Sequence, residues 1–172
     1  MPNHTIQLAT PNDAERLSAF AIAQFITTYA DQNNPDDSQA YVNSTLTPEI
    51  LKLELLDEKA RTLLVIRDTQ LLAYAQIRFR DKHALVSQHD ALELQRFYVA
   101  HSEHGNGLAQ TLMREVQQHA LALGGQYLWL SARERNPRAM AFYVKLGFID
   151  MGVTDFYVGS DRQTDHILIA RL

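Results

Sequence analysis

Two glycines one residue apart, Gly105 and Gly107, stand just before a helical pattern and are the first feature that could hold a ligand. Glycine allows backbone conformations that a β-carbon forbids, and it leaves backbone N–H groups uncovered by side chains. At the start of a helix, such N–H groups bind anions. We therefore expect an anion-binding loop made of His104, Gly105, Asn106, Gly107, Leu108 and Ala109.

Two common phosphate-binding motifs do not fit this loop. A dinucleotide fingerprint needs a third glycine where Gln110 stands, and a Walker loop needs a Gly-Lys-Ser/Thr string that the segment lacks. A zinc site is not predicted either, because His101 and His104 have no convincing third ligand in the sequence. We predict no bound metal.

The elements on either side of the loop are clearly marked. The helix 108–123 is indicated by an apolar stripe and ends at two glycines. In the strand 92–99, the apolar positions change from even to odd numbers, and one extra residue near Gln95 and Arg96 would bring them all to one face. This pattern predicts a β-bulge, although a central strand buried on both faces would need no such alternation.

A second helix, 138–146, follows a short strand at 128–130. Asn136 is a good N-cap, Pro137 suits the first helical position, and Gly147 suits the end of the helix. Tyr143 lies on the same helical face as Ala139, Phe142 and Leu146. We therefore expect the Tyr143 side chain to point into the protein.

These two segments together resemble the GCN5-related N-acetyltransferase (GNAT) superfamily. The matching strings are Tyr98-Val99, the glycine loop, and Glu134-x-Asn136-x-x-Ala139-x-x-Phe142-Tyr143-x-Lys145-x-Gly147-Phe148. The resemblance implies an α/β fold with a mixed, mostly antiparallel central sheet of about seven strands flanked by helices. It also implies that acetyl-coenzyme A is the acetyl donor.

In that superfamily the glycine loop holds the coenzyme A pyrophosphate, and the bulged strand separates from its neighbour to admit the pantetheine arm. The resemblance therefore assigns coenzyme A contacts to the strand, the loop, the cap and the helix, namely Phe97, Tyr98, Val99, His104, Gly105, Asn106, Gly107, Leu108, Ala109, Asn136 and Tyr143. The family usually has Arg or Gln where this chain has His104. A partly protonated His104 would donate to the pyrophosphate. Asn136 has the alternative of only capping its helix.

Acetyl transfer to an amine needs a base and an acid. The amine must lose a proton before it attacks, and Glu93 matches the position of a glutamate that acts as base in many members of the superfamily. Tyr143 is the candidate acid for the leaving thiolate. The alternative is that Glu93 is a strand carboxylate paired with a neighbouring cation and that Tyr143 is a core tyrosine.

A longer resemblance indicates the acceptor. Phe25-x-x-Thr28-Tyr29-x-x-Gln32-Asn33-x-Pro35-x-Asp37-x-x-x-Tyr41 and Gly159-x-Asp161-x-Gln163-Thr164-Asp165 are similar to PaiA-type spermidine/spermine N-acetyltransferases, which implies a polyamine acceptor. Polyamine sites combine carboxylates with aromatic faces, a description that fits Tyr29, Asp31, Asp37, Tyr41 and Asp161, with Asp165 nearby. Another small amine, a protein amino group, or a non-catalytic acyl-coenzyme A sensor remain the alternatives.

The rest of the chain reads as a single domain, residues 1–172. The expected elements are a strand at 5–8, helices at 14–29, 36–46 and 48–57, a hairpin of 61–67 with 71–79, a polar loop at 80–90, and closing strands at 148–158 and 164–172 around 159–163.

Composition excludes several other classes. The 172 residues include no cysteine, so a cysteinyl-enzyme intermediate is excluded. A net charge of −4 argues against nucleic acid as a partner, and no apolar run is long enough to span a membrane. We therefore expect a cytoplasmic protein whose partner is a small-molecule amine. The resemblance is also compatible with a homodimer.

Overall fold

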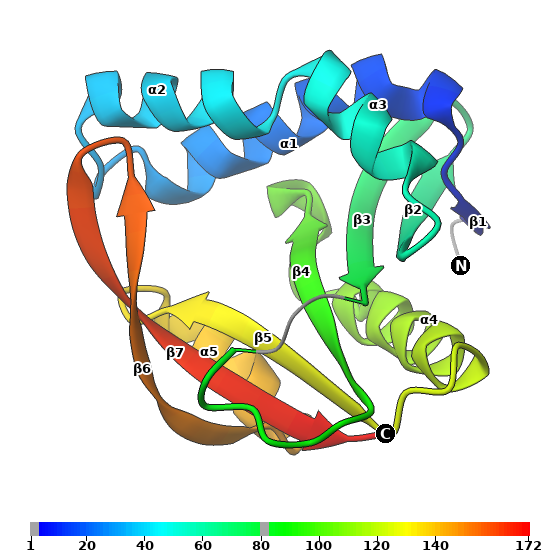
Figure 1. Cartoon of the computed structure of the whole chain (residues 1–172). Helices are drawn as coiled ribbons and strands as arrows, with labels where there is room; N and C mark the ends of the chain where they lie inside the picture. The colour runs from blue at the N-terminus through cyan, green and yellow to red at the C-terminus, as the bar shows by residue number, and fades with distance from the viewer. Residues whose placement is uncertain (1–3, 80–82) are drawn as a thin grey trace.

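The computed structural model describes residues 4–79 and 83–172 and is built on one seven-stranded sheet, in the order β1-β2-β3-β4-β5-β7-β6 (Figure 1). The strands are β1 (Thr5–Leu8), β2 (Ala60–Arg67), β3 (Gln70–Arg78), β4 (Ala91–Val99), β5 (Tyr127–Arg133), β6 (Ile149–Val158) and β7 (Asp161–Arg171). The helices are α1 (Ala14–Tyr29), α2 (Pro35–Thr45), α3 (Pro48–Leu56), α4 (Leu108–Ala122) and α5 (Pro137–Lys145), with 3-10 turns at Pro11–Asp13 and His101–Glu103. The predicted α/β fold, with its mixed and mostly antiparallel sheet, is confirmed.

Helices cover both faces of the sheet. Side chains alternate along a strand, so Leu63 and Val65 of β2 face the apolar cluster that contains α4 and α5, whereas Leu64 and Ile66 face the cluster that contains α1, α2 and α3. Figure 1 shows these two groups of helices on separate sides of the strands. Each group of helices therefore packs against its own face of the sheet.

The sheet opens between β4 and β5. These strands pair in parallel only from Ala91 with Tyr127 to Glu93 with Trp129, and beyond that point β4 has no partner on this side within the described residues. Figure 1 shows the two strands separating like the arms of a V. Backbone groups along the inner edge of β4 are therefore available to a ligand.

A β-bulge lies at the start of this opening. Arg96 pairs with Gln76 of β3, but Leu94 pairs with the next residue, Ile77, so Gln95 is the extra residue on β4. The change of apolar parity correctly predicted the bulge and its position. The insertion bends the strand and turns the following residues toward the opening.

Most predicted elements agree with the structure to within one or two residues, but the closing hairpin does not. We expected a turn over 159–163, whereas β7 begins at Asp161 and the turn consists of Gly159 and Ser160. Gly159 has a φ of +58°, which permits this short turn, and Asp37 accepts a hydrogen bond from the Ser160 N–H (2.7 Å). The predicted polar loop 80–90 has neither helix nor strand over 83–90, and its residues 80–82 lie outside the described residues.

None of the helices in the described ranges is both long enough and apolar enough to cross a membrane.

Candidate functional site

A cavity of about 500 Å³ occupies the opening between β4 and β5. Its walls come from β4, β5, the glycine loop, α5, and the ends of α1 and α2. Most of the residues predicted from the sequence line it: Tyr29, Tyr41, Glu93, Phe97, Tyr98, Val99, His104, Gly105, Gly107, Ala109, Asn136 and Tyr143. The topology therefore brings together residues from five separate segments of the chain.

The glycine loop has the geometry of an anion site. Gly105 and Gly107 have φ angles of +90° and +86°, and a β-carbon at either position would meet no atom within 4 Å. Glycine is thus required for the backbone conformation and not for space. Gly107 is the N-cap of α4, so the first N–H groups of this helix are directed at the loop.

Two predicted loop residues lie away from the cavity wall. Leu108 is buried in the apolar core, and the Asn106 side chain donates to Glu103 Oε2 (3.1 Å). Glu103, which we did not predict, also accepts hydrogen bonds from both Nη atoms of Arg67 at the end of β2, each at 3.0 Å. These hydrogen bonds hold the pKa of Glu103 below its usual value. The Arg67–Glu103 pair thus anchors the glycine loop to the sheet.

His104 is held against the end of β4. Its Nε2 lies 3.0 Å from the Val99 carbonyl oxygen, which can only accept, so Nε2 carries the proton. Burial lowers the pKa of His104, with further lowering by Arg138 and His101. The lowered pKa disfavours the partly protonated form of His104 that we expected from the sequence. Its Nδ1 is buried with no hydrogen-bond partner among the described residues.

Tyr143 points into the cavity, as the helical pattern predicted. Asn136 caps α5 by accepting from the Ala139 N–H (3.1 Å), and this cap fixes the beginning of the helix. The Tyr143 ring packs edge-on against Phe97 and Phe148, with centroids 6.4 and 5.5 Å away. Burial raises the pKa of Tyr143 well above its ordinary value, so the phenol stays protonated and can donate at neutral pH.

Glu93 lies at the closed end of the opening. It belongs to the last paired position of β4 with β5, opposite Trp129, and it is 7% exposed. Since it lines the same cavity as Tyr143, the structure brings both candidate catalytic residues to one space.

The opposite end of the cavity is aromatic. The Phe25 and Tyr41 rings stack with centroids 4.7 Å apart, Tyr29 lies 5.3 Å from Phe25, and Phe156 of β6 lies 6.0 Å from Tyr41. The guanidinium carbon of Arg133 sits 4.8 Å from the centre of the Tyr29 ring. Tyr29 and Tyr41 thus belong to one group of aromatic rings at this end of the cavity.

Two polar residues on β7 complete that end. Asp165 receives a hydrogen bond from Ser131 on Oδ2 (2.6 Å), but its Oδ1 is buried with no partner among the described residues. The amide oxygen of Gln163, Oε1, is likewise buried with no hydrogen-bond partner among the described residues. Burial raises the pKa of Asp165, and the Ser131 hydrogen bond and Arg133 oppose this effect.

The three other predicted acids do not line the cavity. Asp31 is exposed, Asp37 accepts from both the backbone and the side chain of Ser160, and Asp161 accepts from the Gln163 side chain (2.7 Å). Asp37 therefore ties α2 to the β6–β7 turn, and Asp161 acts on a residue that does reach the cavity.

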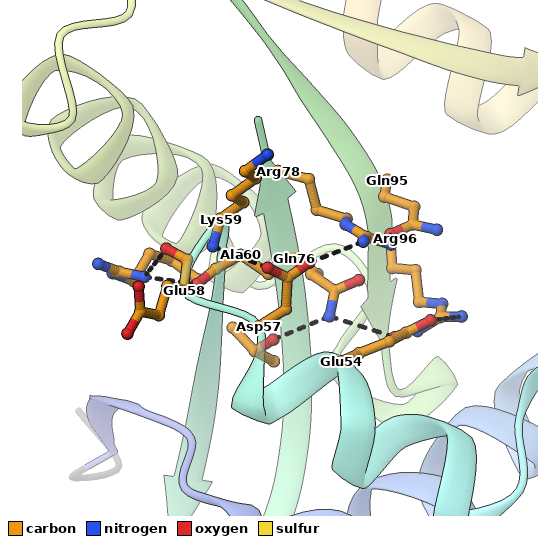
Figure 2. A network of polar contacts seen from close by, with 11 residues as sticks. Glu54, Asp57, Glu58, Lys59, Ala60, Gln76, Arg78, Gln95 and Arg96 are labelled. Carbon is orange, nitrogen blue, oxygen red and sulfur yellow. Dashed lines mark hydrogen bonds and ion pairs between the residues drawn. The ribbon is translucent and has the colours of Figure 1, made fainter. Parts of the chain in front are cut away.

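A buried ion pair joins the bulge to α3. Both Arg96 Nη atoms bind the Glu54 carboxylate, and Gln76 donates to the same carboxylate (3.3 Å), as Figure 2 shows. We did not predict this pair, because the two residues are 42 positions apart and neither belongs to a local motif.

No group of three or more His, Cys, Asp or Glu within residues 4–79 and 83–172 could hold a metal ion.

A sheet that opens at a bulged strand, beside a glycine loop at a helix N-terminus, is the architecture of coenzyme A-dependent acyltransferases. The model of the acetyltransferase (GNAT) family matches residues 22–148, most of the chain, and the protein belongs to this family. It is an N-acetyltransferase that uses acetyl-coenzyme A. The uncovered loop amides and the unpartnered edge of β4 fit the pyrophosphate and the extended arm of that donor.

Known proteins are similar over almost the whole chain. An uncharacterized N-acetyltransferase of Mycobacterium bovis is 28% identical over 161 residues, which cover 93% of this chain and 98% of the relative. Among solved structures, PaiA N-acetyltransferase from Thermoplasma acidophilum, in complex with coenzyme A, superposes with a TM-score of 0.80 and 19% identity over 99% of both chains. Mutant forms of the spermidine/spermine N-acetyltransferase SpeG from Vibrio cholerae superpose with a TM-score of 0.65 and 17% identity, over 98% of this chain and 95% of the SpeG chain. At these identities the two structures show the fold alone.

Proposed function

We propose that the protein transfers an acetyl group to a primary amine of a small acceptor that carries a second positive charge, as a polyamine does. The transfer is direct, within a ternary complex of enzyme, acetyl-coenzyme A and amine. The observation that carries this acceptor class is a pair of buried acceptor atoms, Asp165 Oδ1 and Gln163 Oε1, at the aromatic end of the cavity.

The orientation of the Gln163 amide is fixed by its neighbours. Its Nε2 donates to Asp161 Oδ2 (2.7 Å) and to Asn33 Oδ1 (3.0 Å), and a carboxylate can only accept. The amide oxygen must therefore be the atom of this cavity-lining residue that has no partner among the described residues. Gln163 and Asp165 are two residues apart on β7 and thus share one face of the strand.

Two such acceptors favour a ligand that donates hydrogen bonds, and an ammonium group satisfies both. An unpartnered buried carboxylate oxygen is costly, so a bound ammonium group would relieve a cost already present in the free protein. The aromatic rings of Tyr29 and Tyr41 provide the faces that cations prefer. Arg133, the cross-strand neighbour of Asp165, would repel the ammonium group, which we therefore place on the Gln163 side.

At the other end of the cavity, Glu93 and Tyr143 supply the proton transfers. Glu93 accepts a proton from the amine, directly or through water, and the neutral nitrogen then attacks the thioester carbonyl carbon. As the C–N bond forms and the C–S bond breaks, Tyr143 gives its phenolic proton to the leaving sulfur, and the nitrogen, now part of the amide, releases its second proton to solvent. The Glu93 proton and the Tyr143 phenolate return to their starting states through solvent.

The relatives lend this acceptor class some support. SpeG from Vibrio cholerae is a spermidine/spermine N-acetyltransferase, and two residues of the PaiA-like pattern, Tyr29 and Tyr41, line the cavity here. A protein amino group is the second candidate acceptor, although no separate observation favours it.

The acceptor class is tested with a matched pair of amines, 1,4-diaminobutane and 1-aminopentane, which differ by an ammonium group in place of a methyl group. We expect kcat/KM to be about 10- to 100-fold higher for the diamine, the range of a charge-assisted hydrogen bond. Asp165→Asn should bring the ratio of the two values close to one. Equal values in the wild type would contradict the proposed class, and faster acetylation of a lysine peptide would move the assignment to a protein amino group.

A further inference from the structure

We propose that Arg96 is a positioning residue that keeps the bulge of β4 in the register that acetyl transfer requires, through its ion pair with Glu54. This inference rests on the proposed function, because it assigns Arg96 a role in that reaction. Arg96 is 6% exposed and lines the cavity.

The contacts of Arg96 join three elements. Its two Nη atoms bind the two oxygens of the Glu54 carboxylate, in the last turn of α3, with Nη2 at 3.0 Å from Oε1. Nη2 also lies 3.3 Å from the Thr45 carbonyl oxygen at the end of α2. A lysine could not reproduce this arrangement, because only the guanidinium fork makes two parallel bonds to one carboxylate.

The bulge residue itself has a second attachment to the same helix end. Gln95 Oε1 accepts from Arg78 Nη1 (3.2 Å), and Arg78 Nη2 binds Asp57 Oδ2 (2.9 Å). Asp57 directly follows α3, as Figure 2 shows together with the Glu54 contacts. The end of α3 therefore holds both of the consecutive residues that define the bulge.

This double attachment is compatible only with the bulged register. In a regular strand, consecutive side chains leave opposite faces, so Gln95 and Arg96 could not both be held from the α3 side. Without the extra residue, every side chain from Phe97 onward would change face, and the cavity wall of β4 would be lost. The Arg96–Glu54 pair thus opposes the one rearrangement that would destroy the site.

The geometry that this pair maintains lies along the donor side of the cavity. The unpartnered edge of β4 begins immediately after Glu93, and Arg96 is three residues further along that edge. Displacements of about 1 Å in a reacting group cost on the order of 100-fold in rate. We therefore expect loss of the pair to lower kcat while leaving the coenzyme A loop and its affinity almost intact.

The test compares Arg96→Lys and Glu54→Gln with Arg67→Lys and Arg162→Lys. Arg67 anchors the glycine loop, and Arg162 makes an exposed ion pair with Asp155 (2.9 Å), neither of which lines the cavity. With whichever amine the wild type acetylates best, Arg96→Lys should lower kcat about 10- to 100-fold and change the Kd for coenzyme A less than threefold. Arg67→Lys should instead weaken coenzyme A, and Arg162→Lys should change neither quantity.

Amide hydrogen exchange separates failure of this inference from failure of the proposed function. Exchange of residues 95–99 in the coenzyme A complex should be at least about tenfold faster in Arg96→Lys than in Arg162→Lys, whatever the acceptor is. Unchanged exchange with unchanged kcat would overturn the inference. A parallel loss of kcat, coenzyme A affinity and thermal stability would show a general structural role and would also overturn it.

Discussion

Tyr143→Phe separates catalysis from folding more cleanly than any other substitution in this cavity. The change removes one hydroxyl group and keeps the ring, whose packing against Phe97 and Phe148 stabilises that part of the core. The buried phenol has a raised pKa and is therefore a proton donor, not a phenolate, throughout the neutral range. If it protonates the leaving thiolate, its loss should act on the chemical step alone.

The expected magnitude follows from this role. General acid catalysis contributes about 100- to 10,000-fold, which corresponds to about 3 to 5 kcal/mol of transition-state stabilisation. The free energy of unfolding should change by only about 1 kcal/mol, the value of one hydrogen-bonding group. Because the pKa of Tyr143 is raised, the deficit in kcat should be the same across the neutral pH range.

The assay is steady-state release of free coenzyme A in the presence of saturating amine, together with calorimetric binding of coenzyme A and a thermal unfolding curve. The predicted result is a kcat at least about 100-fold lower at nearly unchanged coenzyme A affinity and Tm. A kcat within threefold of the wild type would refute the role of Tyr143 as the acid. A matched loss of Tm would assign the tyrosine to the core.

Three further predictions follow from the same geometry. Glu93→Gln should lower kcat at neutral pH, and the deficit should shrink as the pH rises toward about 10, where the amine loses its own proton; a constant deficit would exclude Glu93 as the base. Because burial lowers the pKa of His104, its contribution to stability is present above its ordinary value of about 6.5 and is lost as the pH falls through the lowered value; calorimetry between about pH 7 and 8.5 should show the same change in coenzyme A affinity for the wild type and His104→Asn, and a steeper change in the wild type would contradict a neutral His104 in this range. Gly159→Ala should lower the free energy of unfolding by more than about 2 kcal/mol, since its β-carbon would lie 2.4 Å from Asp37 Oδ1 at a φ of +58°, whereas Gly107→Ala, with no atom in the way, should cost about 1 kcal/mol; equal Tm values for the two variants would refute this.

Local sequence patterns predicted the elements that carry the donor side of the site. The apolar stripe of α4, the Asn136 cap of α5 and the inward direction of Tyr143 all depend on residues within a few positions of one another. The bulge at Gln95 could also be predicted, because the apolar residues of β4 change from even-numbered to odd-numbered positions within the strand. Such short-range signals arise because the spacing of apolar residues follows the repeat of the helix or strand, and this spacing is visible in the sequence.

Long-range pairs left no such signal. Arg96 with Glu54 and Arg67 with Glu103 join residues 42 and 36 positions apart, and either arginine could equally have been a solvated strand residue. The same limit applies to the acceptor end. Acidic residues were predicted there by type, but which of them reach the cavity depends on the β6–β7 turn, and Asp37 is engaged by that turn.

The roles of Asp161 and Gln163 illustrate this limit most directly. Asp161 was expected to contact the acceptor, yet its carboxylate accepts from the Gln163 amide, and the Gln163 amide oxygen is the atom left buried without a partner among the described residues. A sequence gives the residue types of such a pair but not the direction of an amide, which is fixed only when its neighbours are placed.

The most direct test of the whole account is mass-spectrometric detection of product from purified protein, acetyl-coenzyme A and spermidine. We predict a singly acetylated amine that forms in a one-to-one ratio with free coenzyme A and disappears in Tyr143→Phe. Tight binding of coenzyme A with no acetylated product from spermidine, a diamine, a monoamine or a lysine peptide would contradict the account and would indicate an acyl-coenzyme A sensor.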